Sequence, residues 1–256
     1  MDWAKDFYTK QAEWGGWVER WADRPHTDPP AKTRGHVAAV ARLAGNEPMR
    51  ILELGAGSGY TSASLAEAGH SVVAVEFEEA SIANLRRFAS EVNGGELTAV
   101  DGDFYEVDIP GPFDVVCYFD GFGIGTDEDQ RRLLRRIAGW LGLDGCALID
   151  ILTPWYCAGA AGTTEEWEGV VDRYDFDAEG CRMIDRMWRD GDTASAVTQS
   201  IRCYSPADLR LLLEGTGLAL HAVEAWESET YERAVPLDAA MLYLATLLRV
   251  DPPTRR

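Results

Sequence analysis

Short runs of apolar residues alternate with stretches of helical periodicity between residues 49 and 152. We predict that five of the apolar runs are strands, over residues 51–54, 72–75, 97–100, 115–119 and 147–151. Helices are predicted between them, over residues 61–68, around residues 82–88 and from Thr126 or Asp127 to about Leu141. Strands and helices that alternate in this way predict a mostly parallel sheet with helices on both faces.

The pattern changes after residue 152. Residues 153–162 are rich in Pro, Gly and aromatic residues, and we predict a loop there. The strand-like runs that follow predict a small antiparallel meander over residues 170–176, 181–188 and 196–203. Ser205-Pro206-Ala207-Asp208 has the residues of a helix start, and the apolar runs at 218–223 and 241–248 indicate two further strands.

These patterns place the chain in one α/β domain that has four parts. We expect an N-terminal helical cap (1–45), a core (46–152), a β-meander cover inserted after the fifth strand (153–204) and a C-terminal completion of the core sheet (205–250). The sheet should be doubly wound, mostly parallel and seven-stranded. With 256 residues, 46% of them hydrophobic, the chain can bury a sizeable core. Ligands on such sheets bind beyond the carboxyl ends of the strands.

The segment after the first strand, Glu53-Leu54-Gly55-Ala56-Gly57-Ser58-Gly59-Tyr60, carries the strongest local signal. Glycines let the backbone turn sharply and approach a ligand closely, although a tight connection alone could also use them. A dinucleotide fingerprint needs Gly or Ala where Tyr60 stands, and a phosphate loop needs a lysine that this segment lacks. The carboxylate of Glu53 would repel a phosphate but attract a cationic group such as a sulfonium or an ammonium.

This segment resembles the glycine motif (Asp/Glu)-x-Gly-x-Gly-x-Gly of the class I methyltransferases, which use S-adenosylmethionine (SAM). Further residues stand after the second, third and fourth strands, where that family has functional positions: Glu76, Asp103 with Phe104, and Asp120. The resemblance covers residues 49–152 well and the remainder only in general layout. It implies the Rossmann-like methyltransferase fold, SAM as the cofactor and S-adenosylhomocysteine as the product.

The resemblance also implies roles for these residues. Glu76 would bond both ribose hydroxyls, Asp103 and Phe104 would contact the adenine, and Asp120 would line the methionine end or the acceptor pocket. We predict that the cofactor is bound by Glu53, Gly55, Ala56, Gly57, Gly59, Glu76, Phe77, Asp103, Phe104 and Asp120. The predicted activity is methyl transfer to a small organic molecule. The alternatives are an NAD-type oxidoreductase and a SAM-binding protein without transfer activity.

The acceptor side has weaker signals. Methyl transfer from a sulfonium is an in-line displacement, which can proceed without a dedicated acid or base. Candidate catalytic side chains are His26, His36, Tyr8 and Tyr156. Phe122, Trp155 and Tyr156 follow the fourth and fifth strands, so we expect them to line an apolar pocket for an apolar or aromatic acceptor. The sequence does not distinguish O-, N- and C-methylation.

A formal net charge of −19 argues against a nucleic-acid partner, because proteins that bind a phosphate backbone cluster Lys and Arg. The densest basic stretch, residues 131–136, also carries apolar positions at helical spacing and should be the exposed face of an amphipathic helix. The sequence shows no secretory pattern and no stretch of eighteen apolar residues, and its five cysteines form no C-x-x-C pair. We therefore expect a cytoplasmic protein without a membrane span or a metal site.

Overall fold

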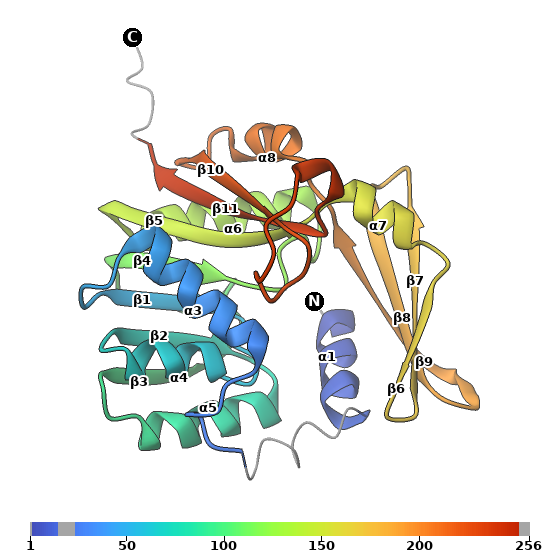
Figure 1. Cartoon of the computed structure of the whole chain (residues 1–256), viewed down its shortest axis with the longest axis horizontal. Coiled ribbons are helices and arrows are strands. Elements are labelled where there is room, and N and C mark those ends of the chain that lie inside the picture. The colour runs from blue at the N-terminus through green and yellow to red at the C-terminus, as the bar shows by residue number, and fades with distance from the viewer. Residues whose placement is uncertain (1, 15–23, 251–256) are drawn as a thin grey trace.

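The structure, a computed structural model, describes residues 2–14 and 24–250. Its central sheet has seven strands in the order β10-β11-β5-β4-β1-β2-β3 (Figure 1). They are β1 (Arg50–Leu54), β2 (Ser71–Glu76), β3 (Glu96–Asp101), β4 (Phe113–Tyr118), β5 (Leu141–Leu152), β10 (Leu218–Trp226) and β11 (Leu242–Arg249). The pairs within β1–β5 are parallel, and β11 is antiparallel to both of its neighbours. The predicted fold class is confirmed.

Helices cover both faces of this sheet (Figure 1). One face packs against α3 (Ala31–Ala44), α4 (Tyr60–Glu67) and α5 (Glu79–Glu91), and the other against α6 (Asp127–Trp140) and α8 (Pro206–Leu213). Side chains of a strand alternate between faces, so Ile51 joins the first layer while Leu52 and Leu54 join the second. Both faces are apolar because both are buried, which is why the central strands are continuous apolar runs. Among the described residues, no helix is long and apolar enough to cross a membrane.

A second sheet follows β5 in the chain. It is antiparallel and consists of β6 (Thr164–Trp167), β7 (Val170–Asp177), β8 (Arg182–Arg189) and β9 (Asp192–Arg202). Helix α1 (Asp2–Trp14) lies between this sheet and the central sheet (Figure 1). Phe7 and Trp14 of α1 are buried against Val170 and Met187 of the second sheet. The packing leaves another side of α1 free to line the space beyond the central strands.

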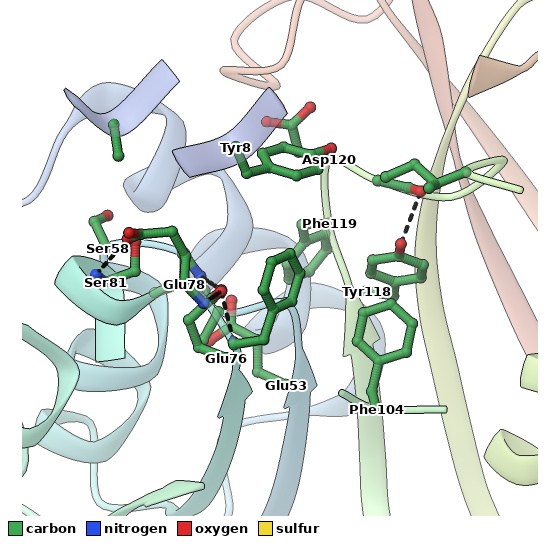
Figure 2. A pocket seen from close by; sticks show the side chains of 18 of the residues that line it. Tyr8, Glu53, Ser58, Glu76, Glu78, Ser81, Phe104, Tyr118, Phe119 and Asp120 are labelled. Carbon is green, nitrogen blue, oxygen red and sulfur yellow. Dashed lines mark hydrogen bonds between the residues drawn. The ribbon is translucent and has the colours of Figure 1, made fainter. Parts of the chain in front are cut away.

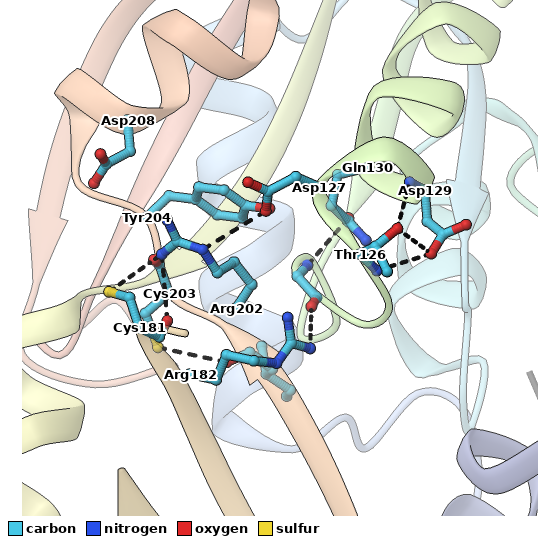
Figure 3. Close-up of polar contacts among 12 residues, drawn as sticks. Thr126, Asp127, Asp129, Gln130, Cys181, Arg182, Arg202, Cys203, Tyr204 and Asp208 are labelled. Atoms are coloured by element: carbon cyan, nitrogen blue, oxygen red, sulfur yellow. Dashed lines mark hydrogen bonds and ion pairs between the residues drawn. The ribbon is translucent and has the colours of Figure 1, made fainter. Parts of the chain in front are cut away.

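Polar contacts join the second sheet to the start of α6 (Figure 3). Thr126 caps α6, because its hydroxyl accepts from the amide of Asp129 while the Asp129 carboxylate accepts from the amide of Thr126. Tyr204, just beyond β9, donates its hydroxyl to Asp127 at 2.8 Å. Arg182 of β8 reaches the carbonyl of Gly123 at 3.3 Å. The second sheet is thus attached to the segment that leads from β4 to α6.

Two local predictions are wrong. The expected loop over residues 153–162 contains helix α7 (Pro154–Ala160). Pro154 stands at the first helical position, where its missing N–H costs nothing, and the aromatic residues after it are compatible with a short helix. The second sheet also has one more strand than predicted, because Thr-Glu-Glu-Trp in β6 lacks apolar alternation and is defined by its pairing with β7. A short 3₁₀ helix, η1 (Leu237–Ala239), precedes β11.

Candidate functional site

A cavity of about 600 Å³ opens at the carboxyl ends of β1, β2 and β4 (Figure 2). Its walls come from the glycine loop after β1, the residues that follow β2, β3 and β4, and helices α1 and α3. This is the edge at which open α/β sheets bind ligands. All of the predicted cofactor-binding residues except Gly59 line it: Glu53, Gly55, Ala56, Gly57, Glu76, Phe77, Asp103, Phe104 and Asp120.

The glycine loop leaves open space at Gly57. This residue has a φ of 51°, and a Cβ atom at its position would meet no heavy atom within 4 Å. The backbone therefore borders the cavity directly, without a side chain in between. Gly59 has a different role, because a Cβ there would lie 2.7 Å from Cδ1 of Leu85. It permits α4 to begin close to α5, which explains its place outside the cavity lining.

Three backbone amides fix the carboxylate of Glu76 at the end of β2. Oε2 accepts from the amide of Gly57 at 2.7 Å, and Oε1 accepts from the amides of Phe77 and Glu78, both at 2.8 Å. Burial raises the pKa of Glu76, and the three amide donors oppose that effect. A buried carboxylate held in one orientation presents its remaining lone pairs to hydroxyl donors in the cavity.

Glu53 is the most deeply buried acid of the cavity, at 4% exposure. The Ser62 hydroxyl of α4 donates to its Oε2. Burial raises the pKa of Glu53 to about 8, although the Ser62 bond acts in the opposite direction. A cationic ligand beside Glu53 would lower that pKa, because the ionised carboxylate then gains a partner.

Residues after β3 form the wall beyond Glu76. The Asp103 carboxylate accepts from the amide of Tyr105 at 2.8 Å, which fixes the turn. The Phe104 ring lies 5.2 Å from the Tyr118 ring, and both rings line the cavity (Figure 2). We call the part of the cavity formed by Gly57, Glu53, Glu76, Asp103 and Phe104 the Gly57 end. It combines carboxylates, bare backbone and an aromatic wall.

The opposite part, which we call the Asp120 end, is built from side chains of distant segments: Tyr8, Lys32, His36, Phe119 and Asp120. Asp120 follows β4 with a left-handed φ of 59°, and its amide donates to the buried Asp150 at 2.6 Å. Lys32 of α3 donates to Asp120 at 2.5 Å and to Glu229 at 2.6 Å. The positive charge of Lys32 lowers the pKa of Asp120. The Asp120 side chain is 59% exposed within the cavity, so a ligand can reach it.

His36 and Tyr8, two of the candidate catalytic residues, line the Asp120 end. His36 is stacked on Phe119 with ring centroids 4.1 Å apart, and its Nδ1 lies 3.2 Å from the Thr61 hydroxyl. Burial, together with the charge of Lys32, lowers the pKa of His36 to about 3, so its imidazole is neutral. Burial also raises the pKa of the Tyr8 phenol, beside Asp120 (Figure 2).

The other two candidate catalytic residues lie elsewhere. His26 is buried between α4 and α5, with its ring nitrogens 2.9 Å from Glu67 and 3.3 Å from Glu91. It anchors the segment before α3 and does not line the cavity. Tyr156 is 43% exposed on α7, also outside the cavity.

The aromatic residues expected to form an acceptor pocket do not line this cavity either. Phe122 is 2% exposed and packs between Tyr118 and Tyr204 in the core. Trp155 and Tyr156 belong to α7, which turns the chain away from the end of β5. The prediction assumed that β5 ends beside the ligand, as β1, β2 and β4 do. An apolar or aromatic acceptor therefore stays a prediction, and other side chains of the cavity would have to contact it, such as Phe119 and Ile124.

Sequence reasoning missed several residues that shape the Asp120 end, namely Lys32, Asp150, Glu229 and Tyr231. The Tyr231 hydroxyl donates to Asp150 at 3.0 Å, and Asp150 in turn holds the backbone of Asp120. No local motif marks these residues, because Lys32 and Glu229 are 197 positions apart. Asp150 alone had a signal, as an acid inside an otherwise apolar strand.

Comparisons with known proteins concern the same region of the chain. Residues 51–145 match the model of a methyltransferase domain family. The chain contains a class I SAM-dependent methyltransferase domain. The matched region of that domain includes the glycine loop, Glu76, Asp103 and Asp120, which line the cavity.

Two curated relatives match parts of this chain. The cypemycin N-terminal methyltransferase of Streptomyces sp is 33% identical over 120 residues, 45% of this chain and 48% of the relative. The probable ribosomal RNA small subunit methyltransferase A of Methanospirillum hungatei is 40% identical over 98 residues, 38% of each chain. The matches thus span less than half the length of either relative.

A solved structure matches over a greater length. The CcbJ methyltransferase of Streptomyces caelestis superimposes with a TM-score of 0.72 at 22% identity, over 91% of this chain and 96% of that one. At this identity the match concerns the fold alone.

Proposed function

We propose that this protein transfers the methyl group of SAM to a small organic molecule held at the Asp120 end of the cavity. The observation that carries the proposal is the meeting of Glu53, Glu76, Asp103 and Asp120, from the ends of four different strands, in one cavity with the glycine loop. Carboxylates are suited to a ligand that carries a sulfonium and an ammonium group.

The residues at the Gly57 end fit SAM chemically. Glu76 would accept hydrogen bonds from the ribose hydroxyls, and Phe104 would pack against the adenine. The open space at Gly57 allows the ligand to approach the backbone. SAM supplies an activated methyl group when bound. The protein holds the acceptor in line with it and excludes competing water, and such positioning can provide much of the rate.

A small-molecule acceptor is supported by the size of the cavity and by the net charge of −19. The basic stretch of α6 is partly neutralised, since Arg132 pairs with Glu106 at 2.5 Å and Arg135 with Glu128 at 3.0 Å. One relative carries the name of a ribosomal RNA methyltransferase, so the prediction that excludes nucleic acid gains no support from the comparisons. The five cysteines are free thiols, which fits the cytoplasmic location that we also propose.

Calorimetric titration of the purified protein with SAM, S-adenosylhomocysteine and NAD tests the cofactor. We expect binding of the first two and none of NAD. Binding of NAD alone would favour the oxidoreductase alternative, for which Tyr60 is the wrong residue at the third small position of the fingerprint. Tight SAM binding without transfer to any acceptor would favour the binding-protein alternative. Failure to bind SAM would overturn the proposed function.

A further inference from the structure

The lining of the cavity is acidic. Its carboxylates are Glu53, Glu76, Glu78, Asp101, Asp103 and Asp120, and its ammonium groups are Lys5 and Lys32. All of these acids except Asp120 lie at or next to the Gly57 end, where the cofactor is proposed to bind. Of the described residues that line the cavity, Asp120 is the carboxylate left to meet an acceptor.

Asp120 is accessible and incompletely paired. Of the described side chains, Lys32 alone hydrogen-bonds to its carboxylate, and that same ammonium group also serves Glu229. Two carboxylates thus share one positive charge, and the negative charge of Asp120 raises the pKa of Glu229. A second cationic or N–H-bearing group would complete the pairing of the two carboxylates.

A buried polar atom without a partner lies next to the Asp120 end. His36 is 4% exposed and lines the cavity, and its Nε2 has no hydrogen-bond partner among the described residues. Nδ1 faces Thr61, and stacking on Phe119 fixes the plane of the ring. A buried imidazole nitrogen without a partner is costly unless a ligand supplies one.

Among the side chains that the structure describes, none of those lining the Asp120 end is a strong base. Burial lowers the pKa of His36 to about 3, and the charge of Lys32 lowers the pKa of Asp120. Lys32 itself is protonated, because Asp120 and Glu229 outweigh the effect of burial and raise its pKa. A hydroxyl or carbon acceptor gains from a base that removes its proton. A neutral amine does not need one, since its lone pair is already available.

We propose that the acceptor is a small molecule with a primary or secondary amine, which binds at Asp120 and receives the methyl group on its nitrogen. This inference rests on the proposed function. The amine enters in its neutral form, which is in equilibrium with the ammonium ion in solution, and its N–H group donates to Asp120. Its lone pair forms the new N–C bond while the C–S bond breaks and its electron pair stays on sulfur. The positive charge moves from sulfur to nitrogen, where Asp120 stabilises it. The methylated ammonium ion then leaves.

The test uses two matched sets of amine, alcohol and carboxylate, namely benzylamine, benzyl alcohol and benzoate, and glucosamine, glucose and glucuronate. A matched pair of amine and alcohol, glycinamide and glycolamide, is added. Thermal unfolding of the protein saturated with S-adenosylhomocysteine measures their binding, and transfer from radiolabelled SAM measures reaction. We expect at least one amine to raise the melting temperature and accept the methyl group, and its oxygen analogues to do neither. A panel in which no amine exceeds its analogues overturns the inference.

Asp120→Asn tests the role of the carboxylate, with the exposed Asp144→Asn as the matched control. We expect Asp120→Asn, measured at saturating SAM, to remove the amine-dependent stabilisation and to slow transfer at least about tenfold. An amine effect that survives in Asp120→Asn contradicts this assignment. If the wild-type protein does not bind SAM, the result is a different one, because it overturns the proposed function itself.

Discussion

The two ends of the cavity are built in different ways. At the Gly57 end, the backbone supplies most of the contacts, and the partners are close in sequence: Glu76 binds the amides of Phe77, Glu78 and Gly57. At the Asp120 end, side chains meet from segments 88 and 197 positions apart. The first end is a local structure, whereas the second exists only once the N-terminal helices and the segment before β11 are in place.

The difference has a functional consequence. The Glu76 carboxylate is held by three backbone amides, so its position is fixed by the strand and the turn that carry it. A substitution at the Asp120 end should therefore leave the position of Glu76 unchanged. The Asp120 end depends on ion pairs between partly exposed side chains, which contribute little individually to stability. Cofactor binding and acceptor choice should therefore respond to different substitutions.

The largest effect is expected from Gly57→Val. A valine would place its side chain in the open space of the cavity and force an unfavourable positive φ. We expect SAM affinity to fall more than about a hundredfold, measured by calorimetry. Gly69→Val is the matched control, because Gly69 also has a positive φ and open surroundings but lies outside the cavity. Equal losses in both variants would show that strain, and not the cavity, is responsible.

Glu76→Ala should have the second-largest effect on SAM affinity. Removing a carboxylate that bonds the ribose costs about 1–3 kcal/mol, which corresponds to roughly five- to 150-fold weaker SAM binding. Glu47→Ala, an exposed site in the turn before β1, provides the control and should bind SAM like the wild type. Unchanged affinity in Glu76→Ala would place the ribose elsewhere.

The pH dependence of SAM binding sharpens the comparison further. The pKa of Glu53, about 8, is raised by burial, and a cationic ligand favours the ionised form. Binding should therefore release a proton, and affinity should rise with pH up to about 8. Below that value it should fall by at most about tenfold per pH unit. Calorimetry in buffers of different ionisation enthalpy measures the number of protons released on binding. Glu53→Gln should abolish this release.

The smallest effect concerns the hydrogen bond between Tyr231 and Asp150, the residue that holds the backbone of Asp120. Tyr231→Phe removes the hydrogen bond to Asp150 and should lower the free energy of unfolding by about 1–2 kcal/mol, measured by denaturant titration. SAM affinity should change less than about twofold. Tyr243→Phe is the control, since the buried Tyr243 hydroxyl has no partner among the described residues. A loss of stability in Tyr243→Phe as large as in Tyr231→Phe would contradict this explanation.

The sequence predicted the central sheet well because each strand and helix there has a local signal. The continuous apolar run before Asp120 indicated a strand covered on both faces, and Thr126 marked the helix start that the capping contacts now explain. Local signals failed where pairing or position decides the structure. The strand β6 exists because β7 lies beside it, and α7 begins with a proline that can occur in a loop or at a helix start.

By itself, the sequence determined the Gly57 end, since a glycine loop, the acid after β2 and the residues after β3 fall at fixed places on consecutive parallel strands. Only the tertiary structure decided the Asp120 end. It brought Lys32, Asp120 and Glu229 together and placed Phe122, Trp155 and Tyr156 outside the cavity. The physical reason is that backbone contacts follow from local conformation, whereas ion pairs between distant segments depend on how whole helices pack.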